Sequence, residues 1–238
     1  MSKSKVRKKE KLFVVSGDRE LSRAVEMGYN IETLFCREGC DEEIVYEDSA
    51  NVFELSTTLF DRVSMGSGSD KFIGILEAKS HYIKDIFVNN YSRVLVLETP
   101  EKPGNIGALL RTATAADWDA VIIANPKTDL YHPQIIRNSI GGVFSIPVAT
   151  DNTEEVISFL EKNAFNISAA TLDYKAKHFK RVKYQRPLAL VFGTEDKGLD
   201  QKWLKKAQHL VKIPVKFPID SLNLSVSAGI FMYHCGDK

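Results

Sequence analysis

Apolar and amphipathic segments alternate along the chain beyond residue 92. Short apolar runs between polar residues predict buried strands at 93–98, 120–124, 166–171, 188–192 and 209–213. The helical spacing of apolar residues between these runs predicts helices near 106–116, 132–140, 153–163 and 200–207. Strands of this apolar character, separated by helices, are typical of a parallel sheet that is covered on both faces, so the pattern predicts an α/β fold.

A smaller pattern precedes this one. Helical spacing is found at 19–27, and short apolar segments predict strands at 33–35, 52–55 and 72–76. Between Leu12 and Lys79 the chain has 6 Lys or Arg against 14 Asp or Glu, whereas from His81 onward the counts are 20 against 16. This shift in charge predicts two domains, a small α/β domain at 1–80 and a larger one at 81–238. We expect the basic tail that opens the first domain to be disordered and to add nonspecific affinity for RNA.

The overall composition limits the classes of partner. The 238 residues carry a net charge of only +1, so any surface that binds nucleic acid must be local. No apolar run is long enough for a membrane span or a secretory signal, and we therefore expect a cytoplasmic protein. Three cysteines are too few for a disulfide framework, and the scattered histidines predict neither a metal site nor a catalytic triad.

Polar loops follow three of the predicted strands, at 103–107, 193–199 and 221–225. In a parallel sheet the carboxyl ends of the strands meet at one edge, where ligands bind, and the free amides of a helix start can hold a ligand. We therefore predict that the three loops form one site. The glycine spacing matches neither a dinucleotide-binding loop nor a phosphate-binding loop. The alternative to a ligand-binding role is tight strand-to-helix packing for Gly104 and Gly107. For Glu195 the alternative is an exposed carboxylate in a turn.

Arg111 is the most unusual residue of these segments. It is surrounded in sequence by apolar residues from Ala108 to Ala116. A charge among apolar residues requires a partner, so we expect Arg111 to meet an acidic group or an anionic substrate.

The residues of the three loops also carry a resemblance. The segments 105–113, 192–199 and 213–225 resemble, in order and spacing, motifs 1, 2 and 3 of the TrmH/SpoU family of RNA 2′-O-methyltransferases. The N-terminal segment resembles, more weakly, the L30e-like substrate-binding domain common in that family. The resemblance implies a SPOUT methyltransferase domain with a C-terminal trefoil knot, S-adenosyl-L-methionine as the cofactor, no metal, and a homodimer whose active site draws on both chains.

The resemblance also implies roles for individual residues. The implied catalytic residues are Arg111, Asn105, Glu195 and Asn223. The implied cofactor contacts are Thr171, Leu172, Gly193, Gly198, Ile213, Leu222 and Asn223. Arg111 would meet the ribose hydroxyl, either as a base whose proton is altered by a nearby phosphate and polar neighbours, or as a group that only orients and stabilises. Ribosomal RNA is favoured over tRNA, and a noncatalytic RNA-binding or assembly factor that kept the fold is the alternative.

A basic loop at 173–186 contains six Lys or Arg residues, with three aromatic residues between them. Cations with interleaved aromatics suit phosphate binding and base stacking, although a solvated basic loop remains the alternative. The residues that we predict to contact RNA are Lys175, Lys177, Lys180, Arg181 and Lys183. The aromatic residues are Tyr174, Phe179 and Tyr184.

Two features depart from the family pattern. Residues 215–218 stand where the family usually has Met and Gly, which predicts a loop of different shape near the cofactor. The sequence ends at Lys238, soon after its last helical segment. We expect a short C-terminal helix to weaken a dimer contact at that helix.

Overall fold

The computed structural model describes residues 3–40, 51–65 and 70–236 and divides into two compact units. The first unit combines residues 1–80 with 129–145, and the second combines 81–128 with 146–238. The second unit is therefore not the uninterrupted stretch 81–238 that the sequence predicts. The reason is that helices α5 (Pro133–Ser139) and α6 (Gly142–Ser145) pack on strand β1 and helix α2 of the first unit.

A four-stranded sheet forms the first unit, in the order β1-β4-β2-β3. Its elements are α1 (Ser4–Glu10), β1 (Leu12–Ser16), α2 (Asp18–Glu26), β2 (Ile31–Arg37), β3 (Asn51–Leu55), α3 (Thr57–Val63) and β4 (Phe72–Glu77). Strand β4 is antiparallel to both of its neighbours, and β3 is parallel to β2. The fully buried side chains of Phe13, Leu21, Leu34 and Leu76 fill its core.

Contrary to our expectation, residues 4–10 of the N-terminal tail are ordered. They form helix α1, and the Arg7 side chain of this helix is only 3% exposed. Arg7 Nε donates a hydrogen bond of 2.6 Å to the carboxylate of Asp129, which is 7% exposed. The tail is ordered because a buried carboxylate from a distant part of the sequence pairs with one of its cations.

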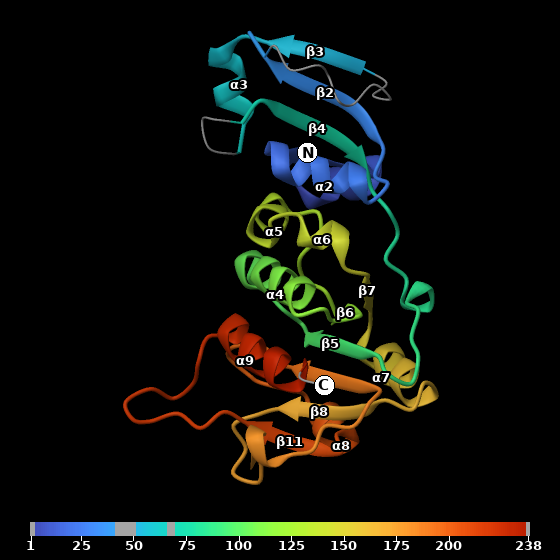
Figure 1. The fold of residues 1–238 in the computed structure, drawn as a ribbon, viewed down its shortest axis with the longest axis vertical. Coiled ribbons are helices and arrows are strands. Elements are labelled where there is room, and N and C mark those ends of the chain that lie inside the picture. Colours follow the sequence, from blue (N-terminus) through green and yellow to red (C-terminus); the bar gives the residue numbers. More distant parts are fainter. Residues whose placement is uncertain (1–2, 41–50, 66–69, 237–238) are drawn as a thin grey trace. The chain divides into compact units, whose positions relative to one another are not determined.

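A seven-stranded parallel sheet, in the order β7-β6-β5-β10-β8-β11-β9, forms the second unit (Figure 1). Its strands are β5 (Arg93–Glu98), β6 (Ala120–Ala124), β7 (Val148–Asp151), β8 (Asn166–Ala170), β9 (Lys177–His178), β10 (Leu188–Phe192) and β11 (His209–Lys212). Its helices are η1 (Ile83–Asp85), α4 (Pro103–Ala115), α7 (Thr153–Lys162), η2 (Phe179–Arg181), α8 (Gln201–Lys206) and α9 (Leu224–Gly236). The predicted α/β class and the five predicted strands are confirmed, whereas the short β7 and β9 were not predicted.

A buried carboxylate fixes the carboxyl edge of this sheet. Glu98, the last residue of β5, accepts hydrogen bonds from Asn125 Nδ2 at 3.0 Å and from Trp203 Nε1 at 2.6 Å. The hydroxyls of Thr99 and Thr153 also donate to it, each at 2.8 Å. A buried carboxylate is tolerated when its oxygens are satisfied in this way. The network joins the end of β5 to the segment after β6, to the start of α7 and to α8. It therefore fixes the strand ends at which the loops of this edge begin.

Candidate functional site

A cavity of about 600 Å³ lies at the carboxyl edge of the parallel sheet in the second unit. Its volume falls in the range of roughly 300–1,000 Å³ that is usual for small-ligand sites. All seven residues predicted to contact the cofactor line it. These are Thr171, Leu172, Gly193, Gly198, Ile213, Leu222 and Asn223. The structure thus brings together the residues that the resemblance implies as cofactor contacts.

The loop after β10 requires glycine at Gly193. A Cβ added there would stand 2.2 Å from the carbonyl carbon of Gly198, a separation that the backbone cannot accept. Thr194 and Gly198 exchange two backbone hydrogen bonds of 3.1 Å, and Gly198 has a φ of +67°. A left-handed backbone conformation favours glycine. The two glycines therefore close a narrow loop whose backbone forms part of the cavity wall.

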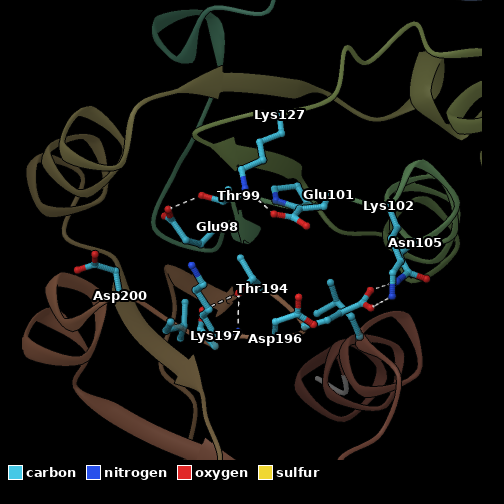
Figure 2. Close-up of a pocket in the computed structure, with 15 residues that line it drawn as sticks. Glu98, Thr99, Glu101, Lys102, Asn105, Lys127, Thr194, Asp196, Lys197 and Asp200 are labelled. Atoms are coloured by element: carbon cyan, nitrogen blue, oxygen red, sulfur yellow. Dashed lines mark hydrogen bonds and ion pairs between the residues drawn. The ribbon is translucent and has the colours of Figure 1, made fainter.

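A second cavity of about 330 Å³ shares residues 194–199 with the first and contains the charged part of the site (Figure 2). There the Glu195 carboxylate accepts a hydrogen bond from Asn105 Nδ2 and forms an ion pair with Lys102. The Glu195 side chain is 27% exposed. It is thus a carboxylate held by two donors from the start of α4, rather than the solvated turn residue of the alternative interpretation.

Asn223 connects helix α9 to this cluster. Its Oδ1 accepts hydrogen bonds from the Ser225 backbone N–H at 2.9 Å and from Ser225 Oγ at 2.6 Å, so it caps the start of the helix. Its Nδ2 points the other way and donates to Asn105 Oδ1 at 3.4 Å. Three of the four predicted catalytic residues, Asn105, Glu195 and Asn223, therefore lie in one hydrogen-bonded group.

Lys102 belongs to this group but was not predicted. It lies three residues before Asn105, and residues at this spacing share one face of a helix. Its ion pair raises its pKa, because both the hydrogen bond and the charge of Glu195 favour the ammonium form. The spacing from Asn105 was the only signal in the sequence that could have indicated it.

Arg111 is the fourth predicted catalytic residue, and the structure does not bring it to the others. It is exposed on α4 and lines neither cavity. Within residues 3–40, 51–65 and 70–236 no hydrogen bond or ion pair to it is found. Leu109 and Leu110 are buried while Arg111 faces solvent. Within these residues Arg111 meets no acidic group, because its apolar neighbours occupy other faces of the helix, and an anionic substrate stays the predicted partner.

The five basic residues predicted to contact RNA are all exposed. Two of the three aromatic residues between them are not available for base stacking, contrary to the prediction. Phe179 is buried against Phe231 and His234. The Tyr184 ring also contacts His234, its hydroxyl donates to the Phe179 carbonyl at 3.0 Å, and burial raises its pKa. These two rings anchor the basic loop to α9 and leave its cations facing solvent.

Two further observations concern the described part of the chain. None of its helices is sufficiently long and apolar to cross a membrane. Within the same residues, no group of three or more His, Cys, Asp or Glu side chains is arranged to hold a metal ion.

Two regions of the chain match the models of known protein families. Residues 92–233 match the model of the SpoU rRNA Methylase family, and residues 1–74 match that of the MRM3-like substrate binding domain. An uncharacterised tRNA/rRNA methyltransferase of Mycoplasma pneumoniae is 37% identical over 145 residues, which are 60% of this chain and 60% of that protein. The 23S rRNA (guanosine(2553)-2′-O)-methyltransferase RlmP of Bacillus subtilis is 23% identical over 230 residues, 97% of this chain and 90% of that protein.

Solved structures show the same fold. The crystal structure of an RNA 2′-O ribose methyltransferase superposes with a TM-score of 0.85 and 32% identity, over 98% of this chain and 91% of that chain. The SpoU methyltransferase AviRb of Streptomyces viridochromogenes, solved with AdoMet, has a TM-score of 0.87 at 23% identity, over 98% of this chain and 93% of that chain. The matched segment 92–233 is more than half of the 238 residues and contains all three loops of the site. The chain belongs to the SpoU rRNA methylase family.

Proposed function

We propose that this protein transfers a methyl group from S-adenosyl-L-methionine to a ribose 2′-hydroxyl of RNA, and that ribosomal RNA is its substrate. The observation that carries the proposal is the cavity of about 600 Å³, whose wall holds all seven predicted cofactor positions and adjoins the hydrogen-bonded group of Asn105, Glu195 and Asn223. The names of the Bacillus subtilis relative and of the 32% identical structure support the reaction class. The first of these names supports ribosomal RNA as the substrate.

The lining of the cavity fits this cofactor. Leu172, Ile213 and Leu222 provide apolar surface for an adenine ring and a methylene chain, and Thr171 adds a hydroxyl. Gly193 and Gly198 bring backbone N–H and carbonyl groups to the wall without side chains. Polar groups placed among apolar ones fix the orientation of a small ligand. When bound, the cofactor supplies a methyl group on a positively charged sulfur.

The remaining requirement is to activate and place the ribose oxygen. A 2′-hydroxyl is a poor nucleophile, and it must lose its proton as its oxygen bonds to carbon. The Glu195 carboxylate is held by Lys102 and Asn105, and it would accept the hydroxyl proton as the oxygen bonds to the methyl carbon and the carbon–sulfur bond breaks. The guanidinium of Arg111 would stabilise the negative charge that develops on the oxygen.

Arg111 must then come from a second copy of the chain, because its own chain directs it away from the cavity. Helix α4 packs against α9, and α9 exposes Val226, Ile230 and Tyr233 to 51%, 38% and 57%. Their spacing places them on one face of the helix. We propose that a second copy covers this apolar face, and that each chain thereby contributes Arg111 to the site of its partner. A C-terminal trefoil knot and a cytoplasmic location are further parts of this proposal.

Calorimetry with S-adenosyl-L-methionine and S-adenosylhomocysteine tests the cofactor site. The wild type should bind both, and Gly193→Ala should bind neither because its Cβ would meet the Gly198 backbone. Gly229→Ala is a matched control, since a Cβ there meets only Thr112 Cγ2 at 3.6 Å. No heat with either ligand would contradict the proposal and favour a noncatalytic RNA-binding factor.

The substrate is tested by mapping 2′-O-methyl positions in RNA from cells with and without the gene. Loss of one mark from ribosomal RNA is the expected result. If a 2′-O-methyl group is lost from tRNA instead, the substrate is tRNA and the proposed reaction still holds.

A further inference from the structure

Two aromatic side chains on loops that line the larger cavity face solvent almost completely. Tyr174 is 82% exposed and Phe217 is 97% exposed. Single exposed apolar residues are common at protein surfaces, and alone neither would call for an explanation. These two stand on separate loops of the second unit, and both loops form walls of the cavity.

Neighbouring strands position the two loops. Strands β8 and β11 are adjacent and parallel, and the chain leaves each at the same edge of the sheet. The Thr171 backbone N–H donates to the Val211 carbonyl at 3.0 Å, and Lys212 Nζ donates to the Asp173 carbonyl at 3.3 Å. These bonds tie the loop of Tyr174 to the base of the loop of Phe217. Figure 1 shows the connection from β11 to α9 projecting away from the sheet.

Both loops also reach the cavity through apolar residues. Leu172, two residues before Tyr174, lines it, and so does Val215, two residues before Phe217. Each aromatic residue has a lysine beside it in sequence. The Lys175 ammonium lies 5.5 Å from the centroid of the Tyr174 ring, and Lys216 is exposed next to Phe217. Two loops that line the cavity therefore each carry an exposed aromatic side chain with a lysine next to it in sequence.

An exposed aromatic ring next to a cation is suited to bind an unpaired nucleotide. The ring stacks on the base and the ammonium attracts the phosphate. Bases inside a duplex do not offer their faces for stacking. We propose that Tyr174 and Phe217 stack on unpaired bases next to the methylated nucleotide, and that the substrate is a single-stranded or loop segment of RNA. The inference rests on the proposed function in that the partner is RNA.

Binding of an oligoribonucleotide of about twelve nucleotides, measured without cofactor, tests this inference. Tyr174→Ala and Phe217→Ala should each weaken the binding of the single strand by about tenfold, within the range measured for base stacking. The dependence of affinity on salt should not change, because no charge is removed. The affinity for the same sequence in a duplex should also stay the same. Tyr174→Phe keeps the ring and should bind like the wild type.

Two variants serve as controls. Tyr91→Ala removes an aromatic side chain that is 75% exposed in the same unit but stands on a loop that does not line the cavity, and Ile219→Ala removes a 55% exposed apolar side chain from the Phe217 loop. Both should retain the affinity of the wild type. If Phe217→Ala and Ile219→Ala weaken binding equally, the loop acts as an apolar surface and not through stacking, and the inference is overturned.

Fluorescence gives a second readout. The native Trp118 and Trp203 are buried, at 4% and 0% exposure, so the indole of Phe217→Trp will be the exposed one. Single-stranded RNA should quench its emission and duplex RNA should not. Unchanged emission and unchanged affinity of the alanine variants would overturn the inference. The inference would also be overturned if Phe217→Ala sediments as a monomer while the wild type sediments as a dimer, or if that variant loses cofactor binding. Failure of the proposed function would instead appear as a wild type that does not bind S-adenosyl-L-methionine.

Discussion

Two arginines, Arg7 on α1 and Arg111 on α4, have environments opposite to those that their sequence neighbours predict. Arg7 lies in a run of lysines and is 3% exposed in an ion pair with Asp129. Arg111 lies among alanines and leucines, and it is exposed. A helix distributes consecutive residues over all its faces, so the burial of a charged residue depends on its face and its partner and not on its neighbours in sequence. The contrast separates an arginine that stabilises the fold from one that is available for chemistry.

The largest effect on stability is expected from Arg7→Ala. It leaves the buried Asp129 carboxylate without its cation, which should lower the free energy of unfolding by about 3–5 kcal/mol. Urea denaturation measures this loss. Lys8→Ala, on the exposed side of the same helix, is the control and should change stability by less than about 0.5 kcal/mol.

A second substitution tests the cause of that loss. Asp129→Asn combined with Arg7→Ala removes both charges and keeps an oxygen for the Tyr131 backbone N–H, which donates to Asp129 Oδ1 at 2.9 Å. The double variant should regain part of the stability, since an unpaired neutral amide is less costly to bury than an unpaired carboxylate. Equal stability of the Arg7→Ala and Lys8→Ala variants would remove the contrast between the two arginines.

For Arg111→Ala we expect the opposite result. Turnover should fall by about 10²–10³, the usual cost of removing a group that stabilises charge in the transition state. Stability and cofactor affinity should stay close to those of the wild type, because Arg111 is exposed and lines neither cavity. Steady-state methyl transfer, urea denaturation and calorimetry on one preparation measure all three. Arg111→Lys keeps the charge but not the planar fork, and should regain only part of the turnover.

Mixed dimers decide whether Arg111 serves the partner's site. Chains with Arg111→Ala and chains with Asn223→Ala should together recover part of the activity that each lacks alone, because one of the two sites in a mixed dimer then has both residues intact. No recovery in the mixture, or a protein that sediments only as a monomer, would show that the two residues do not act across chains.

The central strands could be predicted from the sequence because their burial is encoded locally. The segments 120–124 and 188–192 are apolar throughout, 93–98 is apolar between its charged end residues, and the structure has strands with these same bounds. The cavity lining could be predicted from the resemblance, because the loops that form it follow these strands. Glycine at 193 has a physical reason that the sequence does not show, which is the close approach of the Gly198 backbone.

The features that could not be predicted depend on distant partners. Helix α5 belongs to the first unit because it packs on β1, which lies far from it in sequence. Strand β9 has only two residues and forms through pairing with β11. Phe179 looked like a stacking residue because basic residues flank it, yet its partners are on α9. In each case the local pattern correctly predicts which residues are polar, and a contact with a distant part of the sequence determines the structure.

A smaller effect is expected from the basic loop, whose cations are exposed as Arg111 is. Replacing Lys180, Arg181 and Lys183 with Ala should weaken RNA binding. It should also lower the slope of log affinity against log salt by about 2–3, at roughly 0.7–0.9 for each lost phosphate contact. The three lysines of α8, at 202, 205 and 206, are also exposed and provide a triple substitution with the same change of charge. Equal slopes for both triple variants would mean that the loop is only a solvated surface.

The smallest effect is expected from the lysines around Arg7. Lys5, Lys8 and Lys9 are exposed on α1, so they remain available to phosphate, whereas the guanidinium of Arg7 is buried against Asp129. Replacing the three lysines with Ala should slightly reduce the affinity for nonspecific RNA and its salt dependence, and should leave the free energy of unfolding and the methylated position unchanged. Filter binding at two salt concentrations, with mapping of the methylated nucleotide, measures both. If this variant methylates a different position, the tail selects the site, and the division between a structural Arg7 and weakly binding lysines fails.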